Sequence, residues 1–117
     1  MAIGAEEASE LFRELGEVRV RRMFGGAGLY HDGVMFALEA GGVLYLKADE
    51  ATAEAFRAEG SEPLSYQAST GRRTMASYWR LPERLMDEPD ELAAWARRSA
   101  AVARAGAAAA RPKRRRP

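Results

Sequence analysis

The sequence lacks the residues on which several kinds of functional site depend. It has no cysteine and a single histidine, His31, which excludes disulfides, a thiol nucleophile, thiolate metal sites and a multi-histidine metal centre. No apolar run approaches the roughly 18–20 residues of a membrane span. The first residues carry glutamates where a signal peptide would carry Lys or Arg. We therefore expect a cytoplasmic protein with no metal, no other cofactor and no membrane contact.

The body of the chain has no excess of positive charge, which is concentrated instead at its end. Residues 1–110 hold 13 basic and 17 acidic residues, whereas the last seven residues, RPKRRRP, hold five basic residues and no acid. These five are Arg111, Lys113, Arg114, Arg115 and Arg116. Contact with nucleic acid is therefore predicted to be weak, salt-sensitive and concentrated in this tail. The alternative is a solubilising terminus with no specific partner.

The hydrophobic periodicity predicts an α+β domain. Apolar residues at helical spacing indicate helices over residues 5–15, 50–59 and from about 88 to 105, and alternation with turn signals indicates strands over 17–48 and 63–82. In the last strand, residues 75, 77, 79 and 81 are expected to share one face. Strands joined by such short turns are antiparallel. We predict a two-layer domain over residues 1–105 with about five to six antiparallel strands, flanking N- and C-terminal helices and one short internal helix. Residues 106–117 are expected to be a disordered tail or a fraying helix end.

The run RRMFGGAGLYHDG at residues 21–33 has the glycine content of a phosphate-binding loop. A dinucleotide fingerprint needs a third glycine and a helix directly after the loop, but here the sequence continues as a strand. No helix N-terminus would then face an anion. We interpret the glycines as part of a bulge or a corner between strands. A nucleotide site at Gly25, Gly26 and Gly28 ranks last among the functions considered.

His31 and Asp32 can be drawn as a general base with its orienting carboxylate. No serine lies in the setting of an activated nucleophile, however, and turn residues face solvent. We expect both to be ordinary turn residues.

The aromatic residues of the predicted strands have two interpretations. Aromatic rings on a sheet with arginines nearby stack single-stranded bases in some proteins. The signature of that class is absent here, so we expect most of the rings to lie in the core or at the sheet edges. An exposed remainder would suit a protein interface equally well. The residues concerned are Tyr30, Tyr45, Tyr66, Tyr78 and Trp79.

Four stretches together resemble the N-terminal domain of the TfoX/Sxy family: MFGGxG at 23–28, VLYLKAD at 43–49, SYWxLPE at 77–83 and WAR at 95–97. The resemblance extends over about residues 5–100. It implies an α+β fold similar to the secretion-chaperone-like class, no enzymatic activity, and kinship with regulators of natural transformation competence that act with the cyclic-AMP receptor protein. The signature residues, interpreted as structural, are Met23, Phe24, Gly25, Gly26, Gly28, Tyr78, Trp79 and Trp95.

Those regulators carry a second domain after this one, whereas here only a short tail follows. We therefore expect a stand-alone, non-enzymatic protein-interaction module that forms a homodimer covering its sheet edges. The alternative is a nucleic-acid-associated protein that binds weakly through the basic tail. If nucleic-acid binding survived deletion of the tail, the residues implicated in that binding would be Arg19, Arg21, Arg22, Arg72 and Arg73.

Overall fold

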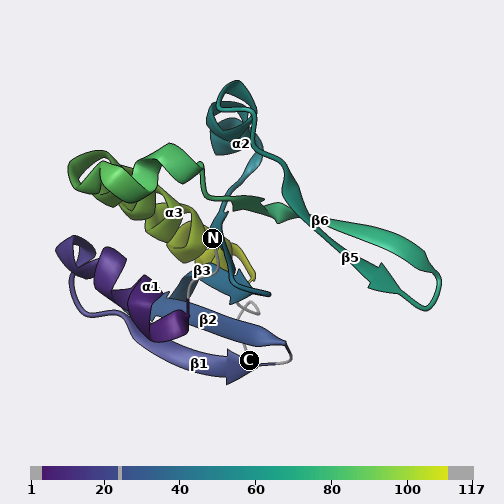
Figure 1. Ribbon diagram of the computed structural model, residues 1–117, viewed down its shortest axis with the longest axis horizontal. Coiled ribbons are helices and arrows are strands. Elements are labelled where there is room, and N and C mark those ends of the chain that lie inside the picture. Colours follow the sequence, from purple (N-terminus) through teal and green to yellow (C-terminus); the bar gives the residue numbers. More distant parts are fainter. Residues whose placement is uncertain (1–3, 24, 111–117) are drawn as a thin grey trace, which may run out of the picture.

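The computed structural model of the chain describes residues 4–23 and 25–110 (Figure 1). The helical elements are α1 (Ala5–Leu11), the 3-10 turn η1 (Arg13–Leu15), α2 (Glu50–Ala58), the 3-10 turn η2 (Glu83–Asp87) and α3 (Pro89–Ala110). The strands are β1 (Arg19–Met23), β2 (Gly26–His31), β3 (Val34–Ala40), β4 (Val43–Lys47), β5 (Pro63–Ala68) and β6 (Gly71–Arg80).

The described strands form one antiparallel sheet in the order β1-β2-β3-β4-β6-β5. The first four follow one another through short turns, as their sequence spacing predicts. After α2 the chain returns through β5 and β6, and β6 takes the place beside β4, which leaves β5 at the edge. The predicted α+β class and the predicted strand number are both confirmed.

The helices bury one face of this sheet. Phe12, which directly follows α1, meets Phe36 of β3 edge to face, with ring centroids 5.2 Å apart. Phe56 of α2 meets Trp95 of α3 in the same way, with ring centroids 4.9 Å apart. These rings belong to one buried cluster with Leu46 of β4 and other apolar residues of the sheet and helices. Such pairs contribute about 0.5–1.5 kcal/mol beyond the burial of their area.

Local sequence sets the start of α2, whereas the first and last helices end differently from the prediction. Asp49 caps α2: its side chain accepts a hydrogen bond from the Thr52 backbone N–H at 2.8 Å, and the Thr52 hydroxyl lies 2.9 Å from the Asp49 N–H. The first predicted helix ends as an α-helix at Leu11 and closes with η1. Helix α3 continues through Gly106 to Ala110. Residues 111–117 lie outside the described part of the chain.

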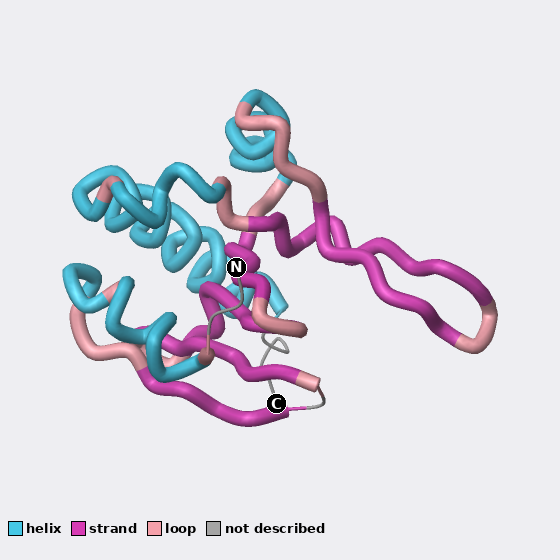
Figure 2. The backbone as a smooth tube through the Cα atoms, in the orientation of Figure 1, coloured by secondary structure: helices cyan, strands magenta, loops and turns pink. Residues whose placement is uncertain are grey.

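Strand β6 is bent, which corrects the prediction of one continuous face over residues 75–81. Trp79 pairs with Pro63, yet the next partners along the hairpin are Met75 and Leu64. Three residues of β6, 76–78, are thus extra in its pairing with β5, and the Trp79 indole N–H donates to the Ala76 carbonyl at 2.9 Å across the bend. Beyond this point the β5–β6 hairpin leaves the body (Figures 1 and 2). The bend arises because β4 pairs with Tyr78–Arg80 and not with the rest of the strand.

Arg84 connects three helical elements. From η2, its guanidinium donates to both carboxylate oxygens of Glu59, at 2.9 and 2.7 Å, and to both oxygens of Glu91 in α3, at 2.9 and 2.7 Å. These hydrogen bonds lower the pKa of both carboxyl groups and raise the pKa of Arg84. Two-pronged contacts of this kind are among the stronger ion pairs in proteins. The arrangement fixes α3 relative to the end of α2.

Candidate interaction surfaces

The second face of the sheet carries a different set of side chains. In an antiparallel sheet, residues directly opposite each other on neighbouring strands project to the same face, so the strand register assigns this face. We call it the open face, because the described helices pack with the buried cluster on the other side. Its residues are Arg19, Arg21, Met23, Gly28, Tyr30, Met35, Leu38, Tyr45, Lys47, Tyr78 and Arg80.

The open face has its own internal packing. A Cβ on Gly28 would lie 2.5 Å from the Met35 sulfur and 3.1 Å from atoms of both Met23 and Tyr30. The absence of a side chain at residue 28 therefore lets these three lie flat across β2. Gly28 thus serves the packing of the open face.

Cations lie over two of the tyrosine rings of this face. The Lys47 Nζ is 4.9 Å from the centroid of the Tyr78 ring, and the Arg21 guanidinium carbon is 5.8 Å from that of Tyr30. Tyr78 is buried, and its hydroxyl lies 3.4 Å from the Met35 carbonyl oxygen, to which it donates. Burial, together with the nearby Tyr30, raises the pKa of Tyr78 to about 12. Tyr78 is therefore a neutral support beneath the more exposed side chains.

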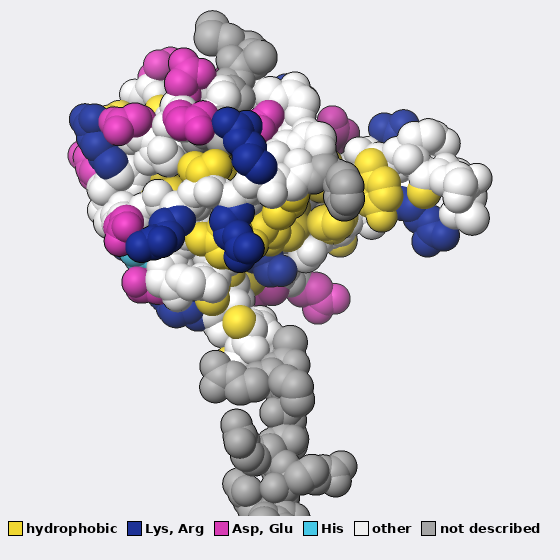
Figure 3. All heavy atoms as spheres, turned by 90° about the horizontal axis from the view of Figure 1, so that it is seen from below, with side chains coloured by type: hydrophobic (Ala, Val, Ile, Leu, Met, Phe, Trp, Pro, Cys, Tyr) yellow, Lys and Arg dark blue, Asp and Glu magenta, His cyan; other side chains and the backbone are white. Residues whose placement is uncertain are grey.

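The open face is positively charged although residues 1–110 are acidic overall. The six strands contain seven Lys and Arg residues but one acid, Glu39. Glu39 stands opposite Ala27 and Leu44 on the helix-covered side and accepts a hydrogen bond from the Gly42 N–H at 2.8 Å. Within the described residues, no carboxylate projects from the open face. Figure 3 shows hydrophobic side chains running toward the base of the hairpin with Lys and Arg beside them.

His31 lies at one end of the sheet, opposite Val34 and on the side away from Tyr30, and its position corrects the expectation of a solvent-facing turn residue. It ends β2, its side chain is only 16% exposed, and its Nδ1 lies 2.9 Å from the Glu17 carbonyl oxygen, where it can donate. Asp32, with a φ of 53°, brings its carboxylate to 3.4 Å from His31 Nε2. The His31 ring thereby holds the chain before β1 against the end of β2. Beside it a hollow is lined by Arg19 and Arg21 and also by the acidic residues Glu17 and Asp32.

The glycine run forms a corner between two strands. Gly25 has a φ of 66° in the turn between β1 and β2, and Gly26 lies so close to β3 that a Cβ would overlap the Glu39 carbonyl oxygen. The chain continues from there as β2. Trp79 and Trp95, also part of the family signature, belong to the buried cluster. Phe24 lies outside the described residues.

The five arginines named from the sequence are placed in three different settings. Arg19 and Arg21 lie on the open face, whereas Arg22 turns to the other side and pairs with Glu6 of α1 at 3.2 Å. Arg72 and Arg73 lie on the hairpin and contact its own side chains, at 3.0 Å from the Ser65 hydroxyl and 2.8 Å from the Thr70 hydroxyl. Only the first two of the five belong to the open face.

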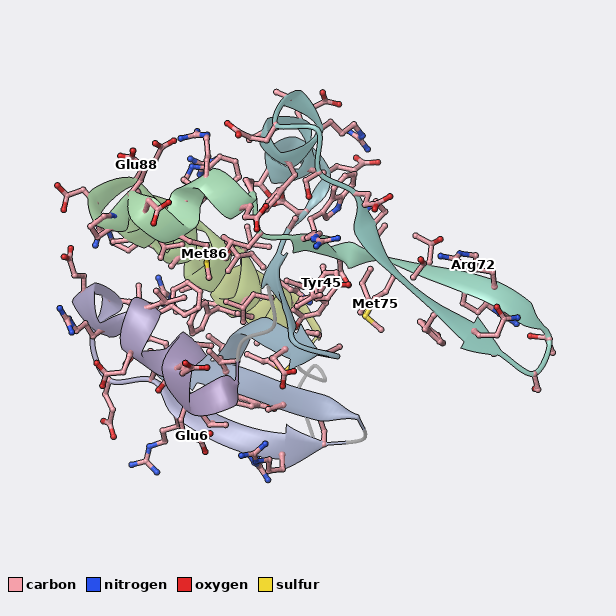
Figure 4. The ribbon with its side chains drawn as sticks, viewed as in Figure 1. Glu6, Tyr45, Arg72, Met75, Met86 and Glu88 are labelled. Atoms are coloured by element: carbon pink, nitrogen blue, oxygen red, sulfur yellow. The ribbon has the colours of Figure 1, made fainter. Side chains whose placement is uncertain are left out.

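The hairpin exposes large apolar side chains. Tyr66 is 48% and Met75 37% exposed. Figure 4 shows Met75 and Tyr45 pointing into the space between the hairpin and the body, whereas Met86 points to the other side of β4. Isolated two-stranded ribbons are marginally stable in water unless another element covers them. The hairpin is therefore a second candidate interaction surface.

The two edges of the sheet differ in charge. Edge strand β1 carries three arginines among five residues, RVRRM, whereas edge strand β5, PLSYQA, carries no charged residue. Charged side chains on an edge discourage pairing with another chain. Of these two edges, β5 is the one that lacks this protection.

Two further findings concern metal binding and membrane crossing. Among the described residues, no group of three or more His, Cys, Asp or Glu residues is placed to hold a metal ion. None of the helices in residues 4–23 and 25–110 has both the length and the apolar character needed to cross a bilayer. The tail residues proposed from the sequence for nucleic-acid contact, Arg111, Lys113, Arg114, Arg115 and Arg116, lie outside the described part of the chain.

The fold and its surfaces define a small α+β domain with one sheet face covered by helices and the other open. The family model described as the TfoX N-terminal domain matches residues 10–103, which is most of the 117-residue chain. The chain belongs to the TfoX N-terminal domain family, and the resemblance stated from the sequence is confirmed. A comparison with curated proteins found no match.

Proposed function

We propose that this protein is a non-enzymatic regulatory domain of the cytoplasm that acts as a homodimer through contacts with other proteins. The family supports the regulatory assignment, because its name is that of a competence regulator. The observation that carries the proposal is the uncharged edge strand β5 on a projecting hairpin with exposed Tyr66 and Met75.

The edge strand pairs with the same strand of a second copy. An interface on a two-fold axis uses the same surface from both subunits, and two antiparallel β5 strands satisfy that condition. The pairing joins the two sheets and covers the apolar side chains of both hairpins. At β1 the same contact would bring three arginines of each copy together, and like charges disfavour it.

Light scattering on the full chain at tens of micromolar tests the dimer. We expect the mass of two chains for the wild type and of one chain for Tyr66→Lys, which places a charge on the free edge. The matched control is Ala101→Lys, which adds the same charge at an exposed residue of α3, away from both strands of the hairpin; it should remain dimeric. A monomeric wild type would exclude the homodimer.

The regulatory role is tested in the organism that carries the gene. Deletion should change the transcript levels of DNA-uptake genes and the frequency of natural transformation, and the wild-type and Ala101→Lys genes should restore both. The Tyr66→Lys gene should restore neither. If deletion leaves both measurements unchanged, the competence role is wrong, whatever the oligomeric state.

A further inference from the structure

We propose that the open face binds single-stranded DNA, with bases stacked on its tyrosine rings and phosphates held by its arginine and lysine side chains. This binding site goes beyond the proposed function and does not depend on it, because the dimer contact uses β5 and the open face extends from β1 to β6. The site is also distinct from the basic tail, from which the sequence predicts nucleic-acid contact.

Charge complementarity selects a polyanion as the occupant. Arg19, Arg21, Lys47 and Arg80 share the face by strand register, and no carboxylate projects from it within the described residues. Glu17 and Asp32 line the hollow beside these arginines, and Glu17 lies 3.5 Å from Arg19, but both acidic side chains are largely exposed, so they attract the cations only weakly. A second copy docked face to face would oppose cations with cations.

The aromatic rings select a ligand with exposed bases. Tyr30 and Tyr45 are half-buried side chains, so each ring is held in place and still reaches solvent. Every base has a π face, and stacking on an aromatic ring contributes about 1–3 kcal/mol per base without reading sequence. In a duplex the base faces are stacked on one another and are not available to a protein ring. The rings therefore favour a single strand.

The spacing of cations and rings suits one strand of nucleic acid. The face extends over β1, β2, β3, β4 and β6, which is four interstrand spacings of about 4.8 Å, or roughly 19 Å. Arg21 lies over the Tyr30 ring, and Lys47 follows Tyr45 by two residues on β4 and projects to the same face, so a base on either ring brings its own phosphate near a cation.

The scarcity of side-chain acceptors for a ribose hydroxyl favours DNA over RNA. Recognition of RNA uses hydrogen bonds to the ribose 2′-hydroxyl, which both donates and accepts. The side chains of the open face include no carboxylate and no amide among the described residues. Of the side-chain oxygens on this face, only tyrosine hydroxyls could then accept a hydrogen bond from a ribose 2′-hydroxyl.

Fluorescence anisotropy with a labelled 12-nucleotide oligo-dT tests the proposal. The protein is the full chain with the five basic tail residues changed to Gln, so that the tail does not contribute. At about 50 mM salt we expect micromolar binding. Four phosphate contacts at about 0.7 each predict a slope of about −3 for log K against log salt. A duplex of the same length should bind at least tenfold more weakly.

Four substitutions separate base stacking from phosphate contact. Tyr45→Leu should weaken binding about tenfold without changing the salt slope, and Tyr45→Phe should retain wild-type affinity, because it keeps the ring. Lys47→Gln should reduce the slope by about 0.7. Arg97→Gln removes a charge from an exposed residue of α3 and should change neither quantity. If Tyr45→Leu unfolds the protein, the comparison of single strand with duplex and the salt slope of Lys47→Gln still test the proposal.

Five outcomes would overturn the assignment. They are no binding at 50 mM salt, equal binding of single strand and duplex, equal effects of Lys47→Gln and Arg97→Gln, tenfold tighter binding of the matching oligo-U, and displacement by a glutamate-rich peptide of equal charge. The last would identify an acidic protein segment as the occupant. The light-scattering result for β5 is independent of all five.

Discussion

Substitution of Gly26 by alanine tests whether the glycine run is a structural corner. The Cβ would overlap the Glu39 carbonyl oxygen and lie 3.0 Å from the Glu39 carbonyl carbon and 3.2 Å from the Ala40 Cα. All three atoms belong to the backbone of β3, so no side-chain rotation relieves the overlap. The strands must separate where Gly26 pairs with Ala40.

The loss of stability follows from the backbone hydrogen bonds and packing that this separation disrupts. One or two backbone hydrogen bonds contribute about 1 kcal/mol each, and overpacking in a closely packed region costs about 1–3 kcal/mol. We expect a loss of about 3 kcal/mol in the free energy of unfolding. For a domain of this size, that corresponds to a fall of about 12 °C in Tm.

Gly106→Ala is the matched control. Gly106 lies inside α3, and a Cβ there would have no neighbour within 4 Å. Alanine is more favourable than glycine in a helix interior by about 1 kcal/mol, so Tm should rise by about 4 °C. Urea unfolding followed by circular dichroism measures both variants. A Gly26→Ala protein as stable as the wild type would refute the close approach of β2 and β3.

Two further predictions concern the helices. In Arg84→Gln the two carboxyl groups that Arg84 bridges regain ordinary pKa values near 4.5. In the wild type the lowered pKa of these groups stabilises the fold while they are ionised, and this stabilisation is lost as they become protonated at low pH. The wild type should therefore lose more stability than the variant between about pH 5 and 3 in urea titrations, and equal losses would contradict the bridge. Phe56→Ala removes a ring between Trp79 and Trp95 and should cost about 3–5 kcal/mol of unfolding free energy, whereas a loss below about 1 kcal/mol would show that Phe56 is not in the core.

Much of the fold was predictable from the sequence because the responsible forces are local. The cap at Asp49, the turns between the first strands and the alternation of apolar residues each involve neighbours in sequence. The short turns also required antiparallel pairing. The bend in β6 was not predictable, because it results from the competition between β4 and β5 for different parts of one strand.

The candidate surfaces were only partly predictable. The sequence located the tyrosines and arginines on strands. Net charge, however, is a sum over the whole chain and does not say to which face of the sheet a charged side chain projects. Counting residues therefore predicted an acidic body with a basic tail. The structure separates Arg21, on the open face, from its neighbour Arg22, which pairs with Glu6 on the helical side. Strand alternation indicates such a separation, but not which face the helices cover.

The sequence by itself determined the secondary structure, the antiparallel sheet and the family, because these depend on residue type and spacing. Only the tertiary structure decided that β5 is an uncharged edge, that Gly26 touches the backbone of β3, and that the open face collects cations without acids. Each of these depends on which distant segments become neighbours. Packing of the buried cluster over the whole domain determines which segments become neighbours, and a local sequence pattern cannot predict this.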